Sequence, residues 1–455
     1  MAEVRGKGYR VIVEDSAQLP KWSRESRILR VGKQWLEADA RFSLFGERMA
    51  GLLLPSIEYD EELSRLVEAY RIRVMAEQAA DLQARIGRLA SQVRVRPSYF
   101  PYSRARLLWH DLGCLIRDGL EPSTLDGEYS PLASRIGSLE DGLVALAPRK
   151  YREVLRVEAS KWRIRAAGLL TSIARRLAGE LHLCEAGAVG DPVDPSPLVM
   201  APEGDYFHEC PKPEGMASRY TGGEASCRRT QWTASTLVCE GPSGRVAVKE
   251  YTRMIVKWLP ASIAGGGIAR YMIRPKARLA NEYKYLRLLR DVLPTPRILG
   301  FCGQYFQSMM ARSFLEGRPV LGSQEPMDWR LSGRALARIH LSGYVLGDAN
   351  PGNFIASGRG EAGIIDAEQA RRFNPRRGAW DLVVYTYYAL FFNAPEDLVA
   401  EGLRSYTGYL AERDPHIMRE IEGNLRDPQL WGPLLLAVNV YQKTRRILDD
   451  VFGLS

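Results

Sequence analysis

The sequence lacks three features that would place it in a specialised class of protein. Its six cysteines are scattered along 455 residues, and none is spaced as C-x-x-C. This argues against a disulfide scaffold and predicts reduced cysteines in an intracellular, cytoplasmic protein. The opening stretch, MAEVRGKGYRVIVEDS, has no apolar core of a secretory signal. The most apolar runs, DLVVYTYYALFF and WGPLLLAVNVY, are too short to cross a bilayer, so we expect no membrane span.

The bulk composition is that of a globular protein with a basic surface. Hydrophobic residues make up 45% of the chain and charged residues 26%. A length of 455 residues predicts two or three domains, because one hydrophobic core rarely covers so long a chain. Lys and Arg outnumber Asp and Glu by 63 to 54, which gives a net charge of +9. Such a charge favours acidic partners, namely nucleotides, phosphorylated substrates, nucleic acid or an anionic membrane surface.

The first part of the chain has the periodicity of helices. From Leu63, apolar residues recur at three-, four- or eight-residue steps as far as Val93, which is typical of one helical stripe. A second, strongly basic pattern lies between residues 149 and 180, and a Gly- and Pro-rich stretch, GAVGDPVDPSPLVMAPEGDYF, reads as a linker. We therefore predict a mostly helical N-terminal domain with a linker over residues 1–205.

After the linker the pattern changes to short strands and helices. TGGEASCRRTQW, TASTLVCEG and GRVAVKEYT read as strands joined by turns, and RPKARLANEYKYLRLLRDVL reads as a helix. The chain turns helical again from Trp329. The predicted fold class is α+β.

One loop carries polar residues that a plain turn does not need. In YVLGDANPGNFI, Asp348 is followed five residues later by Asn353. The next two apolar pieces, NFIA and AGIID, flank a Gly-rich turn and predict a β-hairpin that ends at Asp366. A hairpin brings its two ends together, so Asn353 and Asp366 could hold one ion. A carboxylate and an amide oxygen suit Mg²⁺.

A lysine on an apolar strand forms the second part of the pattern. Lys249 ends the alternating run VAVK, and burial of its ammonium without an anion would be costly. Glu282, on the helix that follows, is the natural partner. We expect this pair to hold the ammonium ready for the phosphates of a nucleotide.

The order of these features resembles the protein-kinase-like superfamily. GDANPGNFI and GIIDAE look most like its atypical branches, which include aminoglycoside phosphotransferases, lipopolysaccharide core kinases and the RIO and KEOPS-complex kinases. The resemblance covers about residues 218–455. It implies a bilobal domain with a small antiparallel sheet lobe over 206–320 and a helical lobe over 321–455, and ATP and Mg²⁺ as cofactors.

The resemblance also assigns roles to residues. Asp348 would be the catalytic base or would orient the hydroxyl, and Asn353 and Asp366 would hold the metal. Lys249, paired with Glu282, would anchor the phosphates. The remaining implied residues are Gly222, Gly223 and Ser226 of TGGEAS over the nucleotide, Phe314 in the hinge MARSFLEG, and Asp381 as the brace of the catalytic loop.

The implied activity is transfer of the γ-phosphoryl group of ATP to a hydroxyl of a protein, sugar, lipid or small molecule. Several departures leave alternatives open. Leu346 replaces the usual His or Tyr before Asp348, and Ala367-Glu368 replaces Phe-Gly after Asp366. A pseudokinase scaffold or an accessory ATPase of RNA-processing machinery is the alternative. The basic segment 270–290 would then contact RNA or a protein complex.

Two H-x-C pairs near the linker raise a separate question. His182 and Cys184 form one pair, and His208 and Cys210 form the other. Four such nitrogen and sulfur ligands would suit zinc, but the one-residue spacing is unusual. The alternatives are a zinc site or side chains that are merely packed.

Overall fold

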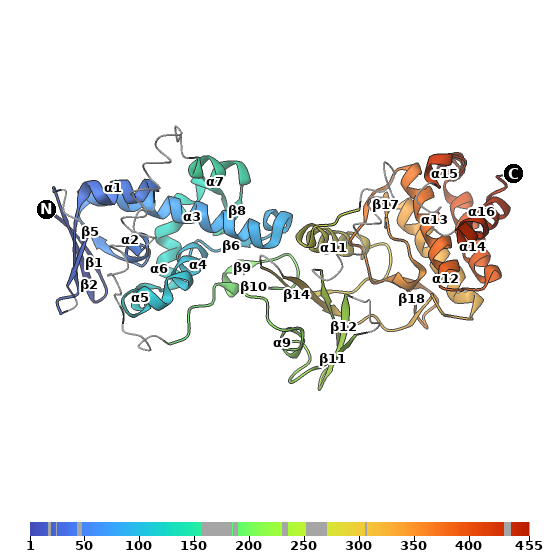
Figure 1. Cartoon of the computed structure of the whole chain (residues 1–455), viewed down its shortest axis with the longest axis horizontal. Helices are drawn as coiled ribbons and strands as arrows, with labels where there is room; N and C mark the ends of the chain where they lie inside the picture. Colours follow the sequence, from blue (N-terminus) through green and yellow to red (C-terminus); the bar gives the residue numbers. More distant parts are fainter. Residues whose placement is uncertain are drawn as a thin grey trace. The chain divides into compact units, whose positions relative to one another are not determined.

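The chain divides into two compact units, coloured by sequence in Figure 1. The computed structural model describes residues 1–16, 20–23, 25–42, 48–156, 184, 190–229, 235–251, 271–304, 307–431 and 438–454. Unit 1 is Met1–Arg85 with Leu89–His208, and unit 2 is Ile86–Arg88 with Glu209–Ser455. The division after His208 lies close to the predicted boundary at 205, while the finer division at 320 stays a prediction. No helix in the described ranges combines the length and hydropathy needed to cross a bilayer.

Unit 1 opens with strands where the sequence analysis expected helices. A sheet in the order β3-β4-β2-β1-β5 is built from β1 (Ala2–Gly6), β2 (Tyr9–Glu14), β3 (Lys21–Ser23), β4 (Ile28–Gly32) and β5 (Glu58–Tyr59). Tyr9, Val11 and Val13 are buried on β2 and alternate with more exposed residues. This is the two-residue period of a half-buried strand. The prediction of a mostly helical N-terminal domain is therefore not confirmed.

The remainder of unit 1 is helical around a second small sheet. The helices are α1 (Lys33–Phe42), α2 (Arg48–Leu53), α3 (Ser64–Ile86), α4 (Tyr99–Leu107), α5 (Trp109–Ile116), α6 (Pro122–Tyr129) and α7 (Pro148–Leu155). The sheet has the order β7-β8-β6-β9, from β6 (Arg94–Val95), β7 (Gly137–Glu140), β8 (Leu143–Leu146) and β9 (Val199–Met200). The predicted stripe is α3, which ends before Gly87, whose φ of 62° is left-handed. Residues 157–180 of the basic pattern lie outside the described residues.

The described part of the predicted linker is ordered, with short strands and buried apolar residues. It contains β9 and the short strand β10 (Asp205–Phe207). Leu198, Val199, Tyr206 and Phe207 are buried. The Gly and Pro content therefore reflects tight turns between anchored apolar residues.

Unit 2 begins with an antiparallel sheet that carries the predicted lysine strand. The strands β14 (Ile298–Gly303), β15 (Ser308–Ser313), β13 (Gly244–Glu250), β12 (Thr236–Gly241) and β11 (Ser226–Arg229) are neighbours in that order. β13 lies between β15 and β12, so both of its edges are hydrogen-bonded. The short helix α9 (Pro213–Ser218) precedes the sheet, and α11 (Pro275–Leu289) follows β13. Leu279, Tyr283 and Leu286 form the buried stripe of α11.

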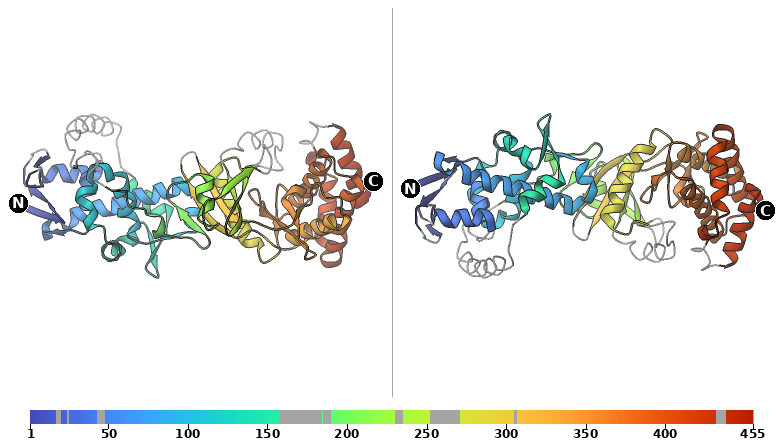
Figure 2. Two further views of the ribbon diagram at one scale, coloured as in Figure 1. Left: turned by 90° about the horizontal axis from the view of Figure 1, so that it is seen from below. Right: turned by 90° about the horizontal axis from the view of Figure 1, so that it is seen from above.

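The second lobe of unit 2 is helical. Figure 2 shows its helices gathered together at the C-terminal, red end of the colour scale. They are α12 (Pro326–Leu341), α13 (Pro375–Phe391), α14 (Glu396–Arg413), α15 (Pro415–Leu425) and α16 (Val438–Phe452). α12 packs on α14, and α13 packs on α15 and α16. Short strands on this lobe are β16 (Arg318–Pro319), β17 (Tyr344–Val345), β18 (Phe354–Ala356), β19 (Ala362–Ile364) and β20 (Arg371–Arg372). The predicted α+β fold with a sheet lobe and a helical lobe is therefore present in unit 2.

The cysteines are paired, which corrects the prediction of reduced thiols. The disulfides are Cys114–Cys184 in unit 1 and Cys210–Cys302 and Cys227–Cys239 in unit 2. Sequence spacing missed them because the partners are 70, 92 and 12 residues apart and meet only in the fold. Cys227 and Cys239, for example, are opposite each other on β11 and β12.

The disulfides also remove the zinc alternative. Cys184 and Cys210 are bonded to other cysteines, so neither offers a thiolate. His182 lies outside the described residues. His208 is buried, and its pKa is lowered to about 3, mainly by burial.

Candidate active site

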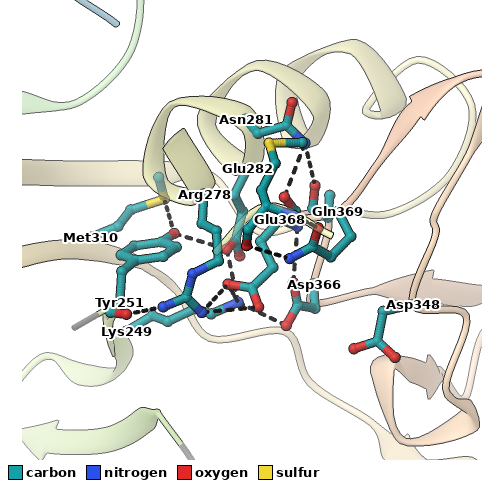
Figure 3. Close-up of polar contacts among 12 residues, drawn as sticks. Lys249, Tyr251, Arg278, Asn281, Glu282, Met310, Asp348, Asp366, Glu368 and Gln369 are labelled. Carbon is teal, nitrogen blue, oxygen red and sulfur yellow. Dashed lines mark hydrogen bonds and ion pairs between the residues drawn. The ribbon is translucent and has the colours of Figure 1, made fainter. Parts of the chain in front are cut away.

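The candidate site is built around Lys249, which projects from the central strand β13 into the interior. Its side chain is 2% exposed, and its Nζ donates to Glu282 Oε2 at 2.8 Å and to Asp366 Oδ2 at 2.7 Å. Glu368 Oε2 lies 3.3 Å from the same atom. Figure 3 shows the three carboxylates converging on the ammonium from α11 and from the loop after β19. The expected contact between Lys249 and Glu282 is therefore present, together with two further carboxylates.

Charges around Lys249 fix its protonation. Burial by itself would lower the pKa of Lys249, but the charges of Asp366, Glu282 and Glu368 raise it above the usual value for lysine. Burial would raise the pKa of the Asp366 carboxyl, yet the Lys249 charge and its hydrogen bond hold that pKa below its usual range. Both groups are thus charged near neutral pH.

Glu282 on α11 is fully buried and contacts several side chains of the sheet lobe. Its Oε2 also accepts a hydrogen bond of 2.8 Å from the Tyr251 hydroxyl. Its other oxygen pairs with Arg312 on β15, and Arg312 also donates to the carbonyl of Ile365, next to Asp366. A buried carboxylate needs this full set of donors to offset its lost hydration.

The hairpin β18–β19 brings Asn353 and Asp366 together at its open end, as predicted. Phe354 is opposite Ile364, and the Ile365 amide donates to the Asn353 carbonyl at 3.0 Å. The Asn353 amide nitrogen donates to the Asp348 carbonyl at 3.0 Å, so the amide oxygen is the atom left to act as a ligand. Two hard oxygen donors fit Mg²⁺, which keeps waters and takes other ligands from phosphates. The residues present therefore suit the metal that the sequence implies.

Asp348 lies in a loop whose backbone amides are hydrogen-bonded to a side chain of α13. Asp381 on α13 accepts from the amides of Leu346 and Gly347, each at 2.7 Å. It also lies 3.2 Å from His340 on α12, and both side chains are buried. The bracing predicted for Asp381 is confirmed. In Figure 3 Asp348 lies beyond Asp366, apart from the cluster around Lys249.

Small residues shape the same loop. Gly347 has a φ of 73°, and a Cβ there would lie 2.8 Å from the Gln369 carbonyl oxygen. Asn350 caps the short turn Pro351–Asn353 by accepting from the Gly352 amide at 2.9 Å. The Gly, Asn and Pro content of this stretch thus fixes the backbone that carries Asp348 and Asn353.

The structure does not bring the TGGEAS loop to Lys249. The loop precedes β11, and the Thr221 carbonyl accepts from Ser243 in the β12–β13 turn at 2.7 Å. Ser226 is opposite Glu240 on β12, whereas Lys249 is opposite Thr236. Four strand residues span about 13 Å, so the loop lies at the other end of the strands. Its residues Gly222, Gly223 and Ser226 are therefore not positioned to cover phosphates bound at Lys249.

Phe314 follows β15, as expected of a hinge residue. Its ring lies 4.3 Å from the Arg245 guanidinium carbon, and the preceding Ser313 is opposite Val246 on β13. Contact with a nucleotide base stays a prediction for Phe314.

The sequence assigned no role to three charged residues of the cluster, namely Arg278, Arg312 and Glu368. Arg278 on α11 is fully buried and lies 3.2 Å from Glu368, and Arg312 pairs with Glu282. Two signals were available in the sequence. Arg278 is four residues before Glu282, hence on the same helix face, and Arg312 interrupts the apolar run SMMA of β15.

Comparisons with known proteins add a likeness of fold. No protein-family model and no curated protein matches the chain. An aminoglycoside-3'-phosphotransferase of type VIII is similar in structure, with 15% identity, a TM-score of 0.33, and coverage of 52% of this chain and 96% of its own. An ethanolamine kinase of Plasmodium vivax has 12% identity, a TM-score of 0.31, and coverage of 50% and 81%. An aminoglycoside phosphotransferase of Alicyclobacillus acidocaldarius has 10% identity, a TM-score of 0.27, and coverage of 54% and 97%. With scores this low, any conclusion on function depends on the geometry of the site.

Proposed function

We propose that unit 2 is an ATP- and Mg²⁺-dependent phosphotransferase that moves the γ-phosphoryl group to a hydroxyl. Lys249 would bind the nucleotide phosphates, and Asn353 and Asp366 would hold Mg²⁺, whose charge offsets that of the phosphates. Asp348 would accept a hydrogen bond from the acceptor hydroxyl and orient it for in-line attack. Positioning and electrostatics supply most of the rate in such chemistry.

One observation carries this proposal. A buried lysine pairs with Glu282 and with Asp366, which comes from a hairpin whose other end is Asn353. Burying these charges costs free energy that a purely structural core would avoid with apolar residues. Buried charges of this kind are typical of functional sites, and a site for phosphate and metal would account for them.

The acceptor is best described only as a hydroxyl-bearing molecule. The basic segment 270–290 offers less to RNA than its composition suggests. Arg278 points into the interior, where it contacts Glu368 and the Tyr251 carbonyl. The proposed partners are therefore a nucleotide and an alcohol acceptor.

A nucleotide-binding or inert scaffold is the second candidate. The observation that favours it is that three carboxylates already surround the Lys249 ammonium. In a scaffold this cluster would be permanent. In a phosphotransferase one carboxylate gives way to phosphate.

ADP formation from ATP separates the two candidates. We expect Mg²⁺-dependent ADP release by the wild type, with radiolabelled γ-phosphate on any acceptor supplied. Asp348→Asn should slow this by about 10²- to 10⁴-fold, the usual contribution of a positioned base, with little change in nucleotide affinity. Asp118→Asn is the matched control, because Asp118 is exposed in unit 1. A wild type that binds nucleotide but forms no ADP with any divalent metal would favour the scaffold.

A further inference from the structure

The ions around Lys249 balance in charge. Among the residues that the ion pairs place together, the cations are Lys249, Arg278 and Arg312, and the anions are Glu282, Asp366 and Glu368. The three carboxylates each offer an oxygen within 4.8 Å of the others. Three positive and three negative charges sum to zero. Asp348 lies beyond Asp366 and outside this cluster (Figure 3).

The Lys249 ammonium donates hydrogen bonds to two carboxylates and forms an ion pair with a third. The contacts are 2.7 Å to Asp366, 2.8 Å to Glu282 and 3.3 Å to Glu368. A nucleotide phosphate that approaches Lys249 competes with these carboxylates. Glu368 has the longest contact, and it has a second partner in Arg278, at 3.2 Å and 3.3 Å. Glu368 can therefore lose its contact with Lys249 and remain paired with Arg278.

The backbone beneath Glu368 is fixed to the sheet lobe. The Asn281 amide donates to the carbonyls of Glu368 and Ala370 at 3.0 Å and 2.9 Å. The Gln369 side chain clamps Met272, accepting from its amide at 2.7 Å and donating to its carbonyl at 3.1 Å. The negative charge of Glu368 thus stays beside Lys249 whether or not a phosphate is bound.

From these contacts we propose that Glu368 is a positioning residue that makes nucleotide binding depend on a divalent metal. The inference rests on the proposed phosphotransferase function. Free ATP is a polyanion, and a cluster without net charge offers it little attraction at short range. A divalent cation that enters with the nucleotide supplies the missing positive charge. Without the Glu368 charge, the cluster would be cationic and would bind ATP without metal.

The test is the dissociation constant of a fluorescent ATP analogue, measured in Mg²⁺ and in EDTA. For the wild type we expect binding at least about tenfold weaker in EDTA, a modest change for one unit charge at about 4 Å. Glu368→Gln should tighten binding in EDTA and shrink this ratio several-fold. The double variant Arg278→Met with Glu368→Gln restores neutrality and should restore the wild-type ratio. A purely structural role of Glu368 would not shrink the ratio in the single variant and restore it in the double variant.

Glu412→Gln is the control, since it makes the same charge change at an exposed carboxylate. Equal wild-type affinity in Mg²⁺ and EDTA would overturn the inference and leave the phosphotransferase proposal standing. That measurement needs no variant, so it can overturn the inference even if Glu368→Gln does not fold. An unchanged ratio in a folded Glu368→Gln protein would also overturn it. Absence of any nucleotide binding in Mg²⁺ would overturn both proposals.

Discussion

At the scale of single residues, the candidate site consists of buried charged groups that stabilise one another through ion pairs and hydrogen bonds. Glu282 is fully buried, yet it contacts Lys249, Arg312 and the Tyr251 hydroxyl. Exchange of any one partner for a neutral group leaves the others in a low-dielectric interior. The stability of unit 2 and the geometry of its site therefore depend on the same atoms.

Glu282→Gln tests this dependence. We expect the free energy of unfolding to fall by about 3–5 kcal/mol, because two buried cations lose a shared carboxylate. Urea unfolding measures the change. Glu401→Gln is the matched control, since Glu401 pairs with the half-exposed Arg330 and should lose only about 0–1 kcal/mol. A loss for Glu282→Gln as small as for the control would contradict the account.

His208 gives unit 1 a dependence on pH. Burial, with the charges of Arg85 and Arg106, lowers the pKa of His208 to about 3 from its usual 6.5. The folded chain then holds fewer protons than the unfolded chain between these values. Stability from neutral His208 is complete above pH 6.5 and is lost as the pH falls toward about 3.

His208→Gln should remove this dependence. Between pH 6.5 and 4, the free energy of unfolding should fall less steeply than in the wild type, by up to about 1.4 kcal/mol per pH unit. Urea midpoints at several pH values give the slope. His416→Gln, at an exposed site, should keep the wild-type slope. Equal slopes for His208→Gln and the wild type would show that His208 titrates normally.

At the scale of elements, hairpins, caps and disulfides fix where the functional side chains lie. The hairpin β18–β19 sets Asn353 beside Asp366, and Asp381 on α13 holds the loop that carries Asp348. The sheet lobe has covalent links as well, from Cys227 to Cys239 across β11 and β12 and from Cys210 to Cys302 on β14. These links constrain the unfolded chain as well as the folded one.

The two disulfides of unit 2 should differ in their effect on stability. The Cys210–Cys302 link closes a loop of 92 residues and Cys227–Cys239 a loop of 12. Loop-closure entropy then predicts losses of about 4–5 kcal/mol and about 3 kcal/mol on conversion of each pair to serine. Urea unfolding without reductant measures both losses. Thiols that titrate in the denatured, unreduced wild type would show instead that the cysteines are free.

At the scale of the whole molecule, the sequence and the fold decided different things. The sequence determined the order of the functional groups in unit 2, because a lysine on a strand, an acid on a helix and a loop before a hairpin are local patterns. Lys249, Glu282, Asn353 and Asp366 could be named from spacing alone. The alternation of apolar and polar residues around Val11 also indicates the opening strands of unit 1. The prediction of a mostly helical domain did not take it into account.

Only the tertiary structure decided which distant groups meet. The disulfide partners, the third carboxylate on Lys249 and the buried Arg278 and Arg312 come together through contacts between separate elements. The position of TGGEAS was likewise set by the register of β11 against β12, which no local motif encodes. Local periodicity reports the state of one segment. Charge balance and covalent pairing depend on distances between segments, and those distances exist only once the chain has folded.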